Sequence, residues 1–148
     1  MRILMGVGND LLGDDGVGVY IADHFVAEGW HTLSCGTVPE NFTSVIRRDQ
    51  PDQVIIVDAA EMRLPPGTFR VIRESDIEDV SVGTHQQPLS HLIAYLRDFI
   101  ADILFIGIQP GDIIPGEPLS GPVRSAAEQV MLMLHQDRVH QIPVFARD

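Results

Sequence analysis

The sequence predicts an α/β fold in which helices cover both faces of a mostly parallel sheet. Short apolar runs alternate with helix-like segments along the whole chain, which is the pattern of such folds. Of the 148 residues, 45% are hydrophobic, which is ample for one core. No repeat, low-complexity tract or linker divides the chain. We therefore predict a single domain over residues 1–148.

Five short apolar segments are predicted strands, because each is bounded by turn or polar residues. They span 2–7, 30–34, 53–57, 68–72 and 103–108. The segment 68–72 follows the turn sequence Leu-Pro-Pro-Gly at 64–67, so we expect it at a sheet edge, where it can be antiparallel.

Helical spacing of apolar residues predicts helices between these strands. Three span 17–28, 88–101 and 122–135, and an irregular tail follows over 136–148. Gly29 is expected to end the first. Thr37 and Glu40 have the spacing of a capping box and predict a further short helix running through Ile46.

The charge and cysteine content exclude several classes of function. The net charge is −11 and no lysine is present, so nucleic acid and anionic lipid would be repelled. The N-terminus lacks the apolar region of a signal peptide. Cys35 is the single cysteine, which excludes an internal disulfide and a cysteine-rich metal site. We expect a cytoplasmic enzyme or partner-binding domain, with no nucleic-acid or membrane partner.

Polar residues occupy three places beside the predicted elements. Segment 9–16 follows the first strand, Asp58 follows the strand 53–57, and segment 84–87 precedes the helix 88–101. Ligands of open α/β sheets collect at the carboxyl ends of the strands, where these segments should meet. Two carboxylates and the His85 imidazole there could bind zinc, nickel, manganese or iron, with positions left open for water or substrate. Each also has a structural interpretation: Asp58 as a cap, Asp14 and Asp15 as partners of a helix dipole, and His85 as a hydrogen-bonded loop residue.

Two further features of the sequence could indicate a different kind of site. Gly6-Val7-Gly8 resembles the start of a dinucleotide fingerprint, but Leu11 occupies the third glycine position. The predicted second strand also lacks the terminal acidic residue that would bind the ribose. The aspartates of segment 9–16 would face the pyrophosphate and repel it. Cys35 could be a nucleophile with His85 as its base, yet a small buried cysteine near a strand end is more often part of the core.

Four sequence blocks carry a resemblance to a known family. They are GVGNDLLGDDGVG at 6–18, VIIVDA at 54–59, THQQPL at 84–89 and GIQP at 107–110. In this order they closely resemble the motifs of the hydrogenase maturation endopeptidases, and they span nearly the whole chain. The last two are most similar to those of the enzymes that serve formate-hydrogenlyase hydrogenases.

The resemblance implies a twisted five-stranded sheet sandwiched between helices. It also implies a protease that removes a C-terminal peptide from a nickel-iron hydrogenase large-subunit precursor after nickel insertion. By motif, the residues that recognise nickel or act in catalysis fall on Asp15, Asp58 and His85. The nickel belongs to the substrate, so the free protease needs no metal of its own.

The resemblance places substrate recognition on four further residues: Asn9, Asp14, Gly36 and Thr37. One departure concerns the last two, because many members carry Asp-Gly-Gly-Thr where this chain has Ser-Cys-Gly-Thr at 34–37. That loop is associated with the choice of hydrogenase.

The mechanism and two other functions remain open from the sequence. Nickel could polarise the scissile carbonyl or activate water, or Asp15 or Asp58 could be the general base. A zinc- or manganese-dependent hydrolase of a small substrate would use the same three ligands, and a metallochaperone would bind the precursor without cutting it.

Overall fold

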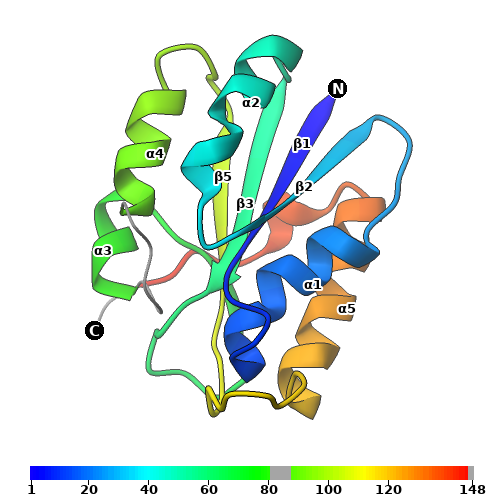
Figure 1. Cartoon of the computed structure of the whole chain (residues 1–148), viewed down its shortest axis with the longest axis vertical. Helices are drawn as coiled ribbons and strands as arrows, with labels where there is room; N and C mark the ends of the chain where they lie inside the picture. Colours follow the sequence, from blue (N-terminus) through cyan, green and yellow to red (C-terminus); the bar gives the residue numbers. More distant parts are fainter. Residues whose placement is uncertain (81–87, 147–148) are drawn as a thin grey trace.

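The computed structural model describes residues 1–80 and 88–146, and it contains one twisted five-stranded sheet (Figure 1). The strand order is β2-β1-β3-β5-β4, with β4 antiparallel to β5 and the other neighbours parallel. The strands are β1 (Arg2–Val7), β2 (Trp30–Gly36), β3 (Gln53–Ala59), β4 (Phe69–Val71) and β5 (Ile103–Ile108). The predicted mostly parallel sheet and its antiparallel edge strand are confirmed.

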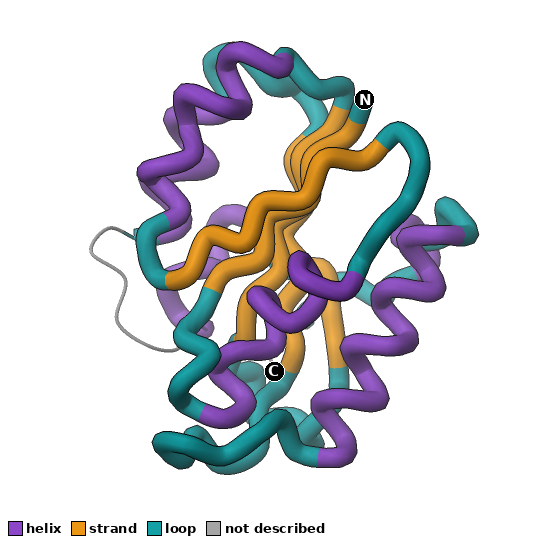
Figure 2. Tube along the Cα trace, turned by 45° about the vertical axis from the view of Figure 1, so that its right-hand side comes forward, coloured by secondary structure: helices purple, strands orange, loops and turns teal. Residues whose placement is uncertain are grey.

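Helices cover both faces of the sheet, so the predicted three layers are present (Figure 2). One face carries α1 (Val17–His24) and α5 (Gly121–His135). The other carries α2 (Thr43–Asp49), α3 (Ile77–Val80) and α4 (Leu89–Leu96). Short 3₁₀ turns precede or follow these helices: η1 (Gly13–Gly16), η2 (Pro39–Phe42), η3 (Glu74–Asp76) and η4 (Val139–Gln141). No helix among the described residues has the length and apolar character needed to cross a bilayer.

The core consists of two clusters, one on each face of the sheet. In β3, Val54 and Ile56 pack toward the side of α2 and α4, whereas Ile55 and Val57 pack toward α1 and α5. All four are fully buried. Central parallel strands are covered on both faces, which explains why they are continuous apolar runs in the sequence.

Helix α1 is shorter than the predicted 17–28. It ends at His24, because Phe25 adopts an extended backbone with φ −84° and ψ 122°. In that conformation Phe25 is 2% exposed and its ring meets Trp30 edge to face at 5.5 Å. Burial of the Phe25 ring therefore ends the helix earlier than the spacing of apolar residues predicts, and Val26 is left 82% exposed.

The predicted capping box is also wrong. The chain enters α2 through η2, and neither the N-cap of η2 nor that of α2 makes a side-chain hydrogen bond. Thr37 thus caps nothing, although the helix exists. Helix α4 ends at Leu96, well before the predicted 101. The described part of the tail, 136–146, is irregular except for η4 and a single bridge between Val144 and Val71, and three of its side chains are buried: Val139, Ile142 and Phe145.

Candidate functional site

The candidate site lies where the strand order reverses. From β1 the chain crosses through α1 to β2 on one side, and then returns through α2 to β3 on the other side. Ligand sites of open α/β sheets form at the carboxyl ends of the strands flanking such a point. Asp58 lies near the end of β3, and Asp15 lies in η1, directly after β1. The predicted edge therefore carries both.

Gly8 packs against both the backbone of Asp15 and the side chain of Asp58. Its φ of +140° is a conformation that side chains other than glycine's rarely adopt. A Cβ atom at this position would lie 2.0 Å from the Asp15 carbonyl oxygen and 3.4 Å from Asp58 Oδ1. Only glycine leaves room for this approach, so Gly8 has a direct structural role in the site.

Both aspartates are almost fully buried, and each carboxylate accepts a hydrogen bond from a backbone N–H. Asp15 is 3% exposed and its Oδ2 accepts a 3.0 Å hydrogen bond from the Asn9 N–H. Asp58 is 1% exposed and its Oδ1 accepts a 2.7 Å bond from the Ala59 N–H. These bonds fix the orientation of the carboxylates before any ligand arrives.

Asp14 faces a different partner from Asp15. Its carboxylate is fully buried and accepts hydrogen bonds from the Gly111 N–H, the Ser120 N–H and the Ser120 hydroxyl, at 2.7–2.8 Å. These bonds tie the turn η1 to the loop that leads into α5. Asp14 therefore has a structural role, and the predicted contact with substrate would require these bonds to break.

Gln109 organises the loop that follows β3, and the sequence analysis did not single it out. The side chain is 4% exposed, and its Oε1 accepts bonds from the Met62 N–H (2.7 Å) and the Leu64 N–H (3.3 Å). Its Nε2 donates to Glu61 Oε2. The one available signal was its place in the block GIQP at 107–110.

Of the other predicted recognition residues, Gly36 is joined directly to the site. Its carbonyl oxygen accepts a 2.8 Å hydrogen bond from the Gly8 N–H, beside an irregularity in the pairing of β1 with β2. Asn9 follows Gly8, and its Oδ1 accepts a bond from the Leu11 N–H. Thr37 follows Gly36 and is half-buried. These three line the same edge as Asp15 and Asp58.

The predicted third ligand, His85, lies outside the described residues. Within the described ranges, no group of three His, Cys, Asp or Glu side chains is placed to hold a metal ion. The geometry therefore supplies two oriented carboxylates, which can accept a proton or ligate a divalent cation.

Cys35 is a core residue in this structure. It is 2% exposed, and burial raises the pKa of its thiol from 9.0 to about 12, with a smaller contribution from the negative charge of Glu40. A thiol with such a pKa supplies almost no thiolate at neutral pH. This supports its interpretation as a small buried hydrophobe.

The chain matches known proteins over most of its length. The family model described as hydrogenase maturation protease matches residues 19–137. The hydrogenase 3 maturation protease of Escherichia coli K12 is 37% identical over 132 residues, covering 86% of this chain and 85% of that protein.

Solved structures agree with these matches. A crystal structure of a hydrogenase 3 maturation protease superimposes with a TM-score of 0.90 at 34% identity, covering 99% of this chain and 97% of the other. A NiFe hydrogenase maturation protease from Thermococcus kodakarensis gives a TM-score of 0.79 at 28% identity, with 93% and 91% covered.

Proposed function

Because this chain belongs to the hydrogenase maturation protease family, we propose that it removes the C-terminal extension of a nickel-iron hydrogenase large-subunit precursor. As a member of that family it is a peptidase. The observation that supports a role for the sheet edge in this reaction is that Asp15 and Asp58, both with buried and hydrogen-bonded carboxylates, lie at this edge on either side of Gly8. We place the reaction in the cytoplasm.

In this proposal Asp15, Asp58 and His85 recognise the nickel that the precursor carries. Carboxylate and imidazole donors suit divalent nickel, and two of the three already sit at the sheet edge with fixed orientation. A precursor without nickel would lack this contact and would bind too weakly to be cut. The metal is part of the substrate, so the protease itself requires no resident ion.

Peptide hydrolysis at this site needs a base for the attacking water. Asp15 or Asp58 can accept the water proton as the hydroxyl group adds to the scissile carbonyl, and the same carboxylic acid can then protonate the departing amine. The precursor's nickel would favour the same step by polarising the carbonyl.

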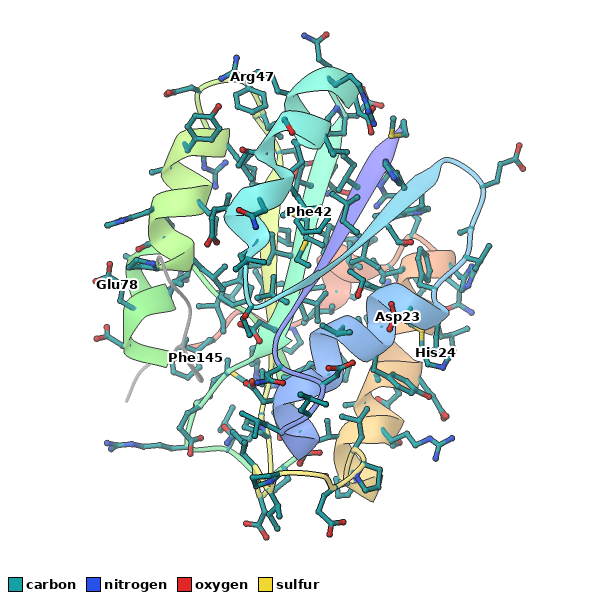
Figure 3. The ribbon with its side chains drawn as sticks, in the orientation of Figure 1. Asp23, His24, Phe42, Arg47, Glu78 and Phe145 are labelled. Atoms are coloured by element: carbon teal, nitrogen blue, oxygen red, sulfur yellow. The ribbon has the colours of Figure 1, made fainter. Side chains whose placement is uncertain are left out.

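The test is processing of a precursor, prepared with and without nickel and followed by mass spectrometry. We expect loss of the C-terminal peptide from the nickel-loaded form alone. Asp15→Asn, Asp58→Asn and His85→Gln should each slow processing by about 100-fold or more while the fold is retained, since a positioned acid or base contributes about that much. Asp23→Asn is the control, because Asp23 is exposed on α1 (Figure 3).

Other outcomes distinguish the alternatives. Equal cleavage of both forms would leave the protease and remove nickel recognition. A stable complex with no change in precursor mass would indicate a binding protein. A requirement for zinc or manganese bound by the free protein would indicate a hydrolase with a metal of its own. Full activity in any of the three variants would contradict the assignment of that residue.

A further inference from the structure

A groove of about 210 Å³ separates the first turns of η2 and α2 from α4. The two helices run side by side on one face of the sheet (Figure 1). Pro39, Pro88 and Leu92 give the groove an apolar surface. Polar groups at its margin come from Glu40, His91 and Tyr95.

A short turn of the chain connects one wall of the groove to the candidate site. Gly36, whose carbonyl oxygen is bonded to the Gly8 N–H, lies at the end of β2, and η2 begins at Pro39. The Cys35 carbonyl oxygen accepts a bond from the Val38 N–H, which fixes the turn between them. A chain lying across Gly36 would therefore reach the groove within a few residues.

Glu40 gives the groove a negative charge that no described residue neutralises. Its side chain is half-buried, and among the described residues none donates a hydrogen bond to its carboxylate or forms an ion pair with it. Its bond with Thr43 uses the backbone carbonyl oxygen of Glu40. A partly desolvated carboxylate of this kind is stabilised by a cation that enters from outside.

The basic side chain of Arg47 contacts Tyr95 and Phe99. Arg47, farther along α2 (Figure 3), donates to the Tyr95 hydroxyl at 3.0 Å and lies 4.5 Å from the centre of the Phe99 ring. It thereby lies against Tyr95 of α4 and the Phe99 ring that follows this helix. Among the described residues that line the groove, Glu40 is the single carboxylate.

We propose that this groove binds a lysine or arginine side chain of the hydrogenase precursor, with the cation at Glu40 and the aliphatic stem against Pro39 and Leu92. This inference rests on the proposed function. Lys and Arg side chains commonly bury their stems on apolar surface while the charged end meets a carboxylate. The net charge of −11, with no lysine in the chain, favours a basic segment as the partner on approach as well as in the complex.

The test compares Glu40→Gln with Glu28→Gln in steady-state processing of nickel-loaded precursor. Both changes remove one negative charge, but Glu28 is exposed and far from the groove, beside the amino end of the sheet. For Glu40→Gln we expect KM to rise about 10-fold with kcat nearly unchanged, because the lost contact is made equally in the bound and transition states. Glu28→Gln should behave like the wild type.

A charge exchange identifies the residue that enters the groove. Each lysine and arginine near the cleavage site of the precursor is changed in turn to glutamate, and each form is processed by the wild type and by Glu40→Arg. We expect one substitution that raises KM with the wild type and is rescued by Glu40→Arg. The melting temperature of each protease variant shows that it is folded.

The results separate this proposal from the proposed function. If the wild type processes the precursor but Glu40→Gln and Glu28→Gln have the same KM, the groove proposal is overturned and the protease assignment stands. Absence of rescue for every basic residue overturns it as well. If the wild type neither binds nor processes the precursor, the proposed function fails, and the groove proposal fails with it.

Discussion

The hydrogen bonds of Asp14 allow a quantitative prediction about stability. Asp14→Ala removes a fully buried carboxylate that accepts hydrogen bonds from the Gly111 N–H, the Ser120 N–H and the Ser120 hydroxyl. These bonds join η1 to a loop about one hundred residues away in the sequence. Their loss should lower the free energy of unfolding far more than an ordinary surface change.

The magnitude follows from opposing contributions. Hydrogen bonds to a charged group contribute about 1.5–3 kcal/mol each, so the three give roughly 5–9 kcal/mol. Burial of the carboxylate costs several kcal/mol in return. Gly111 and Ser120 are both half-exposed, so water can replace part of what is lost. We expect a net loss of about 3–4 kcal/mol, in the range found when one partner of a buried charged pair is removed.

Thermal unfolding followed by circular dichroism measures this loss. With an unfolding entropy of about 2.1 cal/mol/K per residue, a domain of this size loses about 3 °C of melting temperature per kcal/mol, so Tm should fall by about 10 °C. Ser120→Ala removes one of the three bonds and should lower Tm by about 5 °C, at the low end of what one bond to a charged group contributes because Ser120 is half-exposed. Asp10→Ala, an exposed aspartate of the same segment, is the control. A Tm for Asp14→Ala within about 2 °C of the wild type would refute the reasoning.

Three further predictions concern neighbouring parts of the structure. Gly8→Ala should abolish processing and lower Tm, because its Cβ would lie 2.0 Å from the Asp15 carbonyl oxygen; wild-type activity would contradict this geometry. Cys35→Ser should retain processing in the mass assay. The Cys35 thiol ionises near 9.0 when unfolded and near 12 when folded, so its contribution to stability is complete below pH 9 and is lost as pH rises toward 12. Urea unfolding should show a steeper decline over that window for the wild type than for Cys35→Ser. Gln109→Ala should lower stability by about 2–3 kcal/mol, since it leaves the Met62 N–H without its acceptor; an unchanged urea midpoint would count against it.

The strands and the position of Asp58 could be predicted from the sequence for a simple physical reason. A strand buried on both faces is a continuous apolar run, so a carboxylate directly after such a run indicates that the chain is approaching the edge of the sheet. Parallel strands end at one edge, and hence Asp58 and the segment after β1 were expected together. In the structure Gly8 approaches Asp58, while the third predicted segment, 84–87, lies outside the described residues, and β3 continues through Asp58 to Ala59.

The errors arise where distant contacts decide local structure. Phe25 ends α1 because its ring is buried against Trp30 and His135, which helical periodicity does not encode. Thr37 has the right spacing for a capping box, but the chain enters α2 through a 3₁₀ turn and leaves Thr37 without that role. Local patterns predict which segments are helical better than they predict where the helices begin and end.

The different roles of Asp14 and Asp15 show the same limit within two residues. In sequence they are equivalent carboxylates, but η1 turns about 120° per residue, so consecutive side chains point in different directions. Asp14 faces Gly111 and Ser120, which are 97 and 106 residues away, whereas Asp15 faces Asn9. The first aspartate thus secures the turn that carries the second. It follows that Asp14→Ala should lower both stability and processing, whereas Asp15→Asn should abolish processing with little loss of stability, because functional buried carboxylates often reduce the stability of the fold that holds them.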